Sequence, residues 1–198
     1  EKAFEGVTFV FHCAGLISFQ PQDFDKLIEV NVQGTANIVN LSIDFGVKKL
    51  CYVSSVATLS TLPHTPIDEE NDWNNEDNNT DYAISKHGAE MEVWRGSQEG
   101  LPVVIVNPSV VLGGDFADRG SGLLYKKVAD GLRYYPAGAT GFVGVDDVVR
   151  AMVQLQFSEV EGERFVLNAE NLTYKAVLER IANQLGVKAP TKRVSHQM

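Results

Sequence analysis

The sequence of 198 residues is long enough for one domain, or for one domain with a small appendage. Hydrophobic residues make up 44% of it and charged residues 22%, which is ordinary for a globular protein with a buried core. The formal net charge of −9 argues against nucleic acid or an acidic membrane surface as the main partner, but it permits a nucleotide whose phosphates are held by backbone N–H groups.

The cysteines and histidines are too scattered to suggest a metal site. Cys13 and Cys51 each lie inside a short apolar run, as buried free thiols in a reducing compartment do, and the four histidines are far apart. No apolar run is long enough to span a bilayer, and no signal peptide is evident. We therefore expect a cytoplasmic protein with no metal and no membrane partner.

The first part of the chain is expected to alternate between strands and helices. Continuous apolar runs predict strands buried on both faces at 6–15, 47–55 and 101–114. Apolar residues at three- and four-residue spacing predict a helix over 23–45, and another helix is expected to end near 98. The polar stretch 60–81 contains two prolines and is expected to be a long loop. Such alternation is typical of a parallel sheet layered between helices.

The character of the sequence changes after Gly114, where glycine becomes more frequent and the elements become shorter. Residues 142–156 predict a short strand that leads into a helix, and 163–169 predict a further strand. A last helix is expected to begin after Thr173, its N-cap, and to end just before Gly186.

Tyr82 and Lys86 lie one helical turn apart in the helix that follows the loop. A tyrosine can exchange a proton near neutral pH only if its pKa, which is near 10 when free, is lowered. A lysine ammonium on the same face favours the phenolate, and it could also hold the hydroxyls of a ribose. Because such a pair often arises by chance, it indicates proton transfer only where further groups support it. The alternative is a solvated helix pair.

Two serines follow the second predicted strand. Parallel sheets bind ligands at the carboxyl ends of their strands, so Ser54 or Ser55 could hydrogen-bond a substrate oxygen opposite the phenol. Together with the tyrosine and the lysine, such a hydroxyl fits a hydride transfer between a nicotinamide and an alcohol or carbonyl carbon. The alternative for the serines is a plain strand-end cap.

Six segments in one order resemble the extended short-chain dehydrogenase/reductases, and within them the dihydroflavonol reductase-like branch. They are FHCAG, NVQGT, YVSS, YAISK, NPSVVLGG and FVGVDDVVRAM. The resemblance implies a Rossmann-type doubly wound parallel sheet in 1–112 and a smaller α/β substrate-binding region in 113–198, from which 142–157 returns to the Rossmann core. It also implies an N-terminal truncation, because no glycine-rich strand–turn–helix precedes the first predicted strand.

The resemblance assigns a role to each matched residue. Tyr82 would be the catalytic acid/base, and Lys86 would be its electrostatic partner and a ribose ligand. Ser55 would orient the substrate oxygen, with Ser54 as the next candidate, and Asn31 would steady the backbone beside the sheet and relay protons through water. The implied cofactor contacts are Ala14, Gly15, Ser54, Tyr82, Lys86, Pro108, Ser109 and Val110. Possible substrate contacts are Tyr134 and Phe142.

The activity that the resemblance implies is NAD(P)-dependent reduction of a ketone or aldehyde, or oxidation of the matching alcohol. One alternative is a nucleotide-sugar epimerase or dehydratase that uses bound NAD, and another is a non-catalytic NAD(P)-binding regulatory module. The segments SSVAT and TLST depart from the dehydratase and epimerase patterns and favour the reductase. The expected partner is a small carbonyl or alcohol substrate, and a homodimer is compatible with this interpretation. The choice between NAD and NADP stays open.

Overall fold

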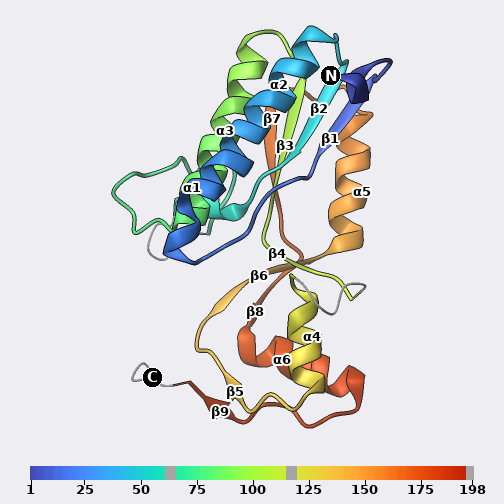
Figure 1. Cartoon of the computed structure of the whole chain (residues 1–198). Coiled ribbons are helices and arrows are strands. Elements are labelled where there is room, and N and C mark those ends of the chain that lie inside the picture. The colour runs from blue at the N-terminus through green and yellow to red at the C-terminus, as the bar shows by residue number, and fades with distance from the viewer. Residues whose placement is uncertain (61–65, 115–119, 195–198) are drawn as a thin grey trace. The chain divides into compact units, whose positions relative to one another are not determined.

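The computed structural model of the chain describes residues 1–60, 66–114 and 120–194 (Figure 1). They form two compact units, which are described separately below. Unit 1 comprises Glu1–Pro108 and Arg150–Val166, and unit 2 comprises Ser109–Val149 and Leu167–Met198.

Unit 1 is built on a four-stranded sheet in the order β1-β2-β3-β7. Its strands are β1 (Phe9–His12), β2 (Lys49–Val53), β3 (Val103–Pro108) and β7 (Glu163–Leu167). β2 pairs in parallel with β1 and with β3, and all six residues of β3 are buried. Figure 1 shows α2 and α3 on one face of this sheet and the C-terminal half of α5 on the other. The predicted α/β class with a parallel sheet is therefore confirmed.

The helices of unit 1 begin with a segment that is less regular than predicted. Instead of one helix over 23–45, a 3-10 turn (Pro21–Asp23) leads into α1 (Phe24–Leu27), a π-helical segment (Ile28–Gln33) and α2 (Gly34–Asp44). π-Helical segments are rare and are found frequently at functional sites. The helix α3 (Asp81–Gln98) ends where the sequence predicts. The apolar core beneath α2 and α3 includes Val39, Leu50, Val93, Val103 and Ile105.

The strand β1 differs from its prediction. We expected it to be buried on both faces, but Phe9 is 37% exposed and Phe11 is 41% exposed, and only His12 is buried. Among the described residues β2 is the only strand beside β1, so β1 lies at the edge of the sheet. The prediction was wrong because apolar composition does not show whether each face of a strand is covered: Phe9 and Phe11 lie on the same face, which the described residues cover only in part.

Unit 2 contains two smaller sheets. The first has the order β4-β6-β8 and consists of β4 (Val110–Leu112), β6 (Ala139–Gly144) and β8 (Glu170–Thr173). The second pairs β5 (Tyr134–Tyr135) with β9 (Lys192–Arg193). β6 is parallel to β4 and antiparallel to β8. The buried core beside α4 (Gly122–Ala129) and α6 (Tyr174–Leu185) is apolar and comprises Val128, Phe142, Val177, Leu178, Ile181 and Ala182.

Several local predictions in the second half of the chain are confirmed. Thr173 caps α6 by accepting a hydrogen bond from the Ala176 N–H, and Gly186 ends the helix with a φ of 65°. The predicted strand and helix over 142–156 correspond to β6 and α5 (Val145–Gln156). The sequence did not predict α4, β5, β8 or β9, which are short elements. Among the described residues, no helix has the length and the apolar composition needed to cross a membrane.

Candidate active site

The side chains of Ser55 and Tyr82 meet in unit 1. Ser55 follows β2 and caps a short 3-10 helix, because its hydroxyl accepts a hydrogen bond from the Ala57 N–H at 3.1 Å. Tyr82 lies in the first turn of α3, which begins at the N-cap Thr80, whose hydroxyl accepts from the Ala83 N–H at 3.2 Å. The two caps fix both backbones, and the Ser55 hydroxyl lies near enough to the Tyr82 phenol to affect its pKa.

The acidity of Tyr82 differs from the prediction. Burial raises the pKa of the phenol above its ordinary value of 10.0, and the nearby Ser55 hydroxyl opposes this rise only in part. We expected the Lys86 ammonium to lower this pKa instead. In this structure desolvation dominates, so the phenol is protonated at neutral pH.

Lys86 is turned toward the sheet. The residue is 5% exposed, and its ammonium donates hydrogen bonds to the Tyr52 hydroxyl at 2.6 Å and to the Val53 carbonyl at 2.8 Å. It also lies 4.4 Å from the centre of the Tyr52 ring. Burial lowers the pKa of Lys86 to about 8, although the Glu90 carboxylate acts in the opposite direction. Two of the three ammonium N–H groups are thus engaged with β2.

Asn31 lies in the π-helical segment and is 2% exposed. Its side-chain oxygen accepts from the Leu16 N–H at 2.7 Å, and its amide nitrogen donates to the Leu16 carbonyl at 3.0 Å and to the Ser85 hydroxyl at 2.9 Å. The side chain therefore ties the segment after β1 to α3. Both amide N–H groups are used in this way, so Asn31 holds backbone in place.

Ala14 and Gly15 are exposed and follow the carboxyl end of β1. A Cβ atom on Gly15 would lie 3.4 Å from the side-chain oxygen of Asn31. A small residue is therefore suited to this position, where the backbone passes close to the Asn31 amide.

The two serines after β2 point in different directions. The Ser54 hydroxyl donates a 2.5 Å hydrogen bond to the carboxylate of Glu90, which is 1% exposed. Thr58 and Asn107 also donate to this carboxylate, each at 3.0 Å. This buried network engages the Ser54 side chain and leaves Ser55 facing Tyr82.

Sequence reasoning did not find Glu90 or Asn107. For Glu90 a signal was present: it follows Lys86 by four residues and Tyr82 by eight, so the three side chains share one face of α3. Asn107 begins the matched segment NPSVVLGG and interrupts an apolar run, but its partners are far away in the sequence, so the segment alone did not indicate its role.

A second buried polar group adjoins Lys86. The His12 ring contacts the Thr35 hydroxyl at 2.9 Å, and its centre lies 5.3 Å from the centre of the Tyr52 ring. Burial and the positive charge of Lys86 lower the pKa of His12 to about 4, so this imidazole is neutral at neutral pH. His12 therefore belongs to the packing of the sheet.

The other predicted cofactor contacts follow or end β3. Pro108 is the last residue of β3. Within unit 2, the Ser109 backbone N–H and hydroxyl both donate to the Leu167 carbonyl, at 3.0 and 3.2 Å. Val110 pairs with Phe142 between β4 and β6.

The two predicted substrate contacts lie in unit 2 and differ in exposure. Tyr134 is 42% exposed in β5, and the Lys192 ammonium lies 5.8 Å from its ring centre. Phe142 is 3% exposed and packs edge-on against Tyr174 in the apolar core. Phe142 therefore has almost no surface with which to line a pocket, because its strand turns it toward the helices of unit 2.

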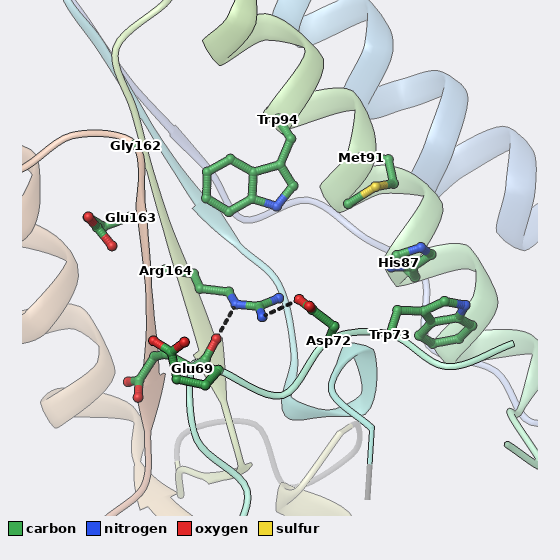
Figure 2. A pocket seen from close by; sticks show the side chains of 10 residues that line it. Glu69, Asp72, Trp73, His87, Met91, Trp94, Gly162, Glu163 and Arg164 are labelled. Atoms are coloured by element: carbon green, nitrogen blue, oxygen red, sulfur yellow. Dashed lines mark hydrogen bonds and ion pairs between the residues drawn. The ribbon is translucent and has the colours of Figure 1, made fainter.

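A cavity of about 540 Å³ lies elsewhere in unit 1, and none of the ten residues that line it is a predicted site residue. His87, Met91 and Trp94 of α3 face it together with the segment 69–73 (Figure 2). The Trp73 and His87 rings are stacked with their centres 4.3 Å apart, and the Arg164 guanidinium of β7 donates to the Glu69 carbonyl at 2.9 Å. Part of the loop predicted at 60–81 therefore packs against α3 and β7. Its residues 61–65 lie outside the described part of the chain.

A family model named NAD_binding_4 and described as male sterility protein matches residues 1–134. Sterol demethylase protein B of Methylococcus capsulatus is 29% identical over 190 residues, which are 95% of this chain and 58% of that protein. Cinnamoyl-CoA reductase 1 of Oryza sativa subsp. japonica is 29% identical over 200 residues, which are 95% of this chain and 57% of that protein.

The fold is similar to that of a solved nucleotide-sugar enzyme. The crystal structure of Thermus thermophilus UDP-glucose 4-epimerase in complex with NAD matches with a TM-score of 0.82 and 25% identity. The match covers 98% of this chain and 67% of that one. The chain thus spans a little under three fifths of the two curated relatives.

Proposed function

The chain belongs to the NAD-binding family described as male sterility protein, within the extended short-chain dehydrogenase/reductases, and we propose that it carries the catalytic set of an NAD(P)-dependent oxidoreductase. Its reaction would be the reduction of a ketone or aldehyde, or the reverse oxidation of an alcohol. The observation that carries the proposal is the placement of the Ser55 hydroxyl beside the Tyr82 phenol, beyond the carboxyl end of β2.

In this proposal the substrate oxygen lies between the Ser55 hydroxyl and the Tyr82 phenol. Ser55 donates a hydrogen bond that orients the oxygen, and Tyr82 gives it a proton during reduction or takes one during oxidation. The phenol is protonated at neutral pH, as reduction requires, but its raised pKa does not favour release of the proton, so the proposal rests on the placement of Tyr82 and not on its acidity. A bound nicotinamide cofactor would supply or accept the hydride.

The residues present fit a nicotinamide cofactor. Lys86 has one further ammonium N–H beyond those used on β2, which suits a ribose hydroxyl. Ala14 and Gly15 offer an exposed backbone that Asn31 holds through the neighbouring Leu16. The remaining predicted contacts with the cofactor are Ser54, through its backbone, and Pro108, Ser109 and Val110.

The substrate is a small carbonyl or alcohol compound in this proposal. Tyr134 keeps an exposed ring and stays a candidate substrate contact, whereas the burial of Phe142 makes it a weaker one. The division into a dinucleotide-binding part at 1–112 and a substrate-binding part at 113–198, the cytoplasmic location and the homodimer stay predictions. The reductase name of one relative supports reduction over the epimerase alternative.

Replacement of the phenol tests the proposal directly. In the full-length protein, Tyr82→Phe should lower kcat by about 10²–10⁴-fold, because the variant cannot transfer the proton. The measurement is NADH or NADPH oxidation with a panel of aldehydes and ketones, next to an assay for UDP-glucose epimerisation. Tyr125→Phe, in α4 of unit 2, is the matched control.

Wild-type kcat in a folded Tyr82→Phe variant would remove this residue from the mechanism. Epimerisation of UDP-glucose without net cofactor oxidation would favour the alternative instead.

A further inference from the structure

Glu90 is a carboxylate in the interior of unit 1, with 1% of its surface exposed. It lies on the face of α3 that carries Tyr82 and Lys86. Removing a carboxylate from water is costly unless hydrogen bonds and opposite charges compensate for it. The partners of Glu90 therefore indicate what this buried charge does.

One oxygen of Glu90 holds the turn that presents Ser55. Oε2 accepts hydrogen bonds from the Ser54 hydroxyl at 2.5 Å, and from the Thr58 hydroxyl and the Asn107 amide at 3.0 Å each. The same Thr58 hydroxyl lies 2.9 Å from the Ser55 carbonyl, and the same Asn107 nitrogen lies 3.1 Å from it. The single Thr58 hydroxyl proton serves either the Ser55 carbonyl or Glu90, whereas the two Asn107 amide protons can serve both, so Asn107 links the Ser55 backbone to the carboxylate and Thr58 packs between them.

The orientation of Asn107 shows how strongly the carboxylate acts. Its nitrogen faces Glu90, while its side-chain oxygen is buried with no hydrogen-bond partner among the described residues. A carboxylate is a stronger acceptor than a neutral group, which favours the amide orientation that points its nitrogen toward Glu90.

The other oxygen of Glu90 lies near two side chains that line the cavity, Trp94 and Arg164. Oε1 lies 3.4 Å from the Trp94 indole nitrogen and 3.5 Å from the Arg164 guanidinium, and both side chains line that cavity. Arg164 is held in place by the Glu69 and Asn71 carbonyls, at 2.9 and 3.2 Å. A fixed cation therefore stabilises the buried carboxylate from β7.

We propose that Glu90 is the positioning residue of the candidate catalytic set, because its carboxylate holds the Ser55 turn in place and supplies the negative charge that faces Lys86. This inference rests on the proposed oxidoreductase function. It does not make Glu90 a catalytic residue, since the carboxylate contacts Ser54, Thr58 and Asn107 and not the phenol.

The charges around Lys86 agree with this role. Burial lowers the pKa of Lys86, and Glu90 acts against that shift and helps to keep the ammonium charged. The other titratable groups that face Lys86 are Tyr52, His12 and Cys13. Those that face Glu90, besides Lys86, are Arg164, His87 and Tyr52.

Two variants of the full-length protein separate the two parts of the proposal. Glu90→Gln keeps the size of the side chain and one acceptor oxygen but removes the charge. Thr58→Val keeps the charge but removes the hydroxyl that packs between it and the Ser55 turn. Glu92→Gln is the matched control, because Glu92 lies two residues away on α3 and pairs with Arg95 at 2.9 Å.

Three measurements apply to each variant. The first is kcat/KM for the carbonyl compound that the wild type reduces fastest. The second is the titration of Lys86 by NMR of lysine side chains, assigned with Lys86→Met. The third is hydrogen exchange of the Ala57 amide, which donates to the Ser55 hydroxyl.

We expect Glu90→Gln to lower kcat/KM on the order of 10²-fold, because small displacements of a catalytic group have effects of this size. Its Lys86 should titrate at a lower pH than in the wild type, and its Ala57 amide should exchange faster. Thr58→Val should show the loss of kcat/KM and the faster exchange with an unchanged Lys86 titration. Glu92→Gln should match the wild type in all three.

Wild-type kcat/KM together with a wild-type Lys86 titration in Glu90→Gln would overturn the proposal. If Glu90→Gln does not fold, wild-type kcat/KM and exchange in Thr58→Val would do the same. If the wild type reduces no carbonyl compound, the proposed function fails. In that case the Lys86 titration and the Ala57 exchange still decide whether Glu90 positions the turn and the ammonium.

Discussion

The helices α3 and α6 begin in the same way and then bury very different side chains. Each follows a threonine N-cap whose hydroxyl accepts a hydrogen bond from the third residue along, Ala83 in α3 and Ala176 in α6. The local rule for starting a helix is therefore the same in both units.

The buried face of α3 carries polar groups of the candidate site, whereas the buried face of α6 belongs to an apolar core. α6 buries only apolar side chains, namely Val177, Leu178, Ile181 and Ala182. α3 buries Ser85, Lys86 and Glu90 among its small and apolar residues. Buried polar groups are tolerated where partners satisfy them, and the partners of α3 come from β2, β3, β7 and the π-helical segment. Buried polar side chains along one helix face therefore distinguish the candidate catalytic region from an apolar core.

The largest expected difference between the two helices is the loss of activity when a lysine of each is replaced. Lys86→Met should reduce turnover on the order of 10²–10³-fold and should weaken cofactor binding, because a buried cation of the proposed site is lost. Lys175→Met removes an exposed lysine from the first turn of α6 and should change neither. Since the pKa of Lys86 is about 8, its ammonium is present below that pH and lost above it. Wild-type cofactor affinity should therefore fall as the pH rises through about 8.

Fluorescence titration of NADH and NADPH across this pH range measures both effects. Wild-type affinity in Lys86→Met would leave no contact between this ammonium and the cofactor.

A somewhat smaller effect is expected from a substitution that leaves a cavity beneath the apolar face of α6. Ile181→Ala should destabilise unit 2 by about 2–5 kcal/mol, because it removes a side chain that is 5% exposed in a packed core. Leu185→Ala changes a side chain that is 45% exposed on the same helix and should cost much less. Urea unfolding followed by circular dichroism gives both values. Equal losses in the two variants would contradict the core assigned to α6.

The smallest effects are expected at the two caps. Thr80→Ala and Thr173→Ala should each cost about 1 kcal/mol, because each leaves one backbone N–H without its partner. Only Thr80→Ala should also slow turnover, since Tyr82 lies in the turn that this cap fixes. Thr80→Ser keeps the hydroxyl and should restore both properties. Thermal unfolding and initial rates test the pair, and an equal loss of turnover in both alanine variants would contradict the assignment.

The sequence by itself determined the local structure and the principal candidates. Apolar runs predicted β2 and β3, and cap residues predicted both ends of α6, because these signals depend on neighbours within a few residues. The spacing of Tyr82 and Lys86 placed them on one helix face, and Ser55 was expected beyond a strand end.

Only the tertiary structure decided the partners. It turned Ser54 toward Glu90 and Ser55 toward Tyr82, and it turned Lys86 toward Tyr52. In the sequence, Ser55 and Tyr82 are 27 residues apart, Tyr52 and Lys86 are 34 apart, and Ser54 and Glu90 are 36 apart. Hydropathy patterns report whether a position is buried, but they do not report which distant polar group will satisfy a buried charge. That choice depends on how the strands and helices pack.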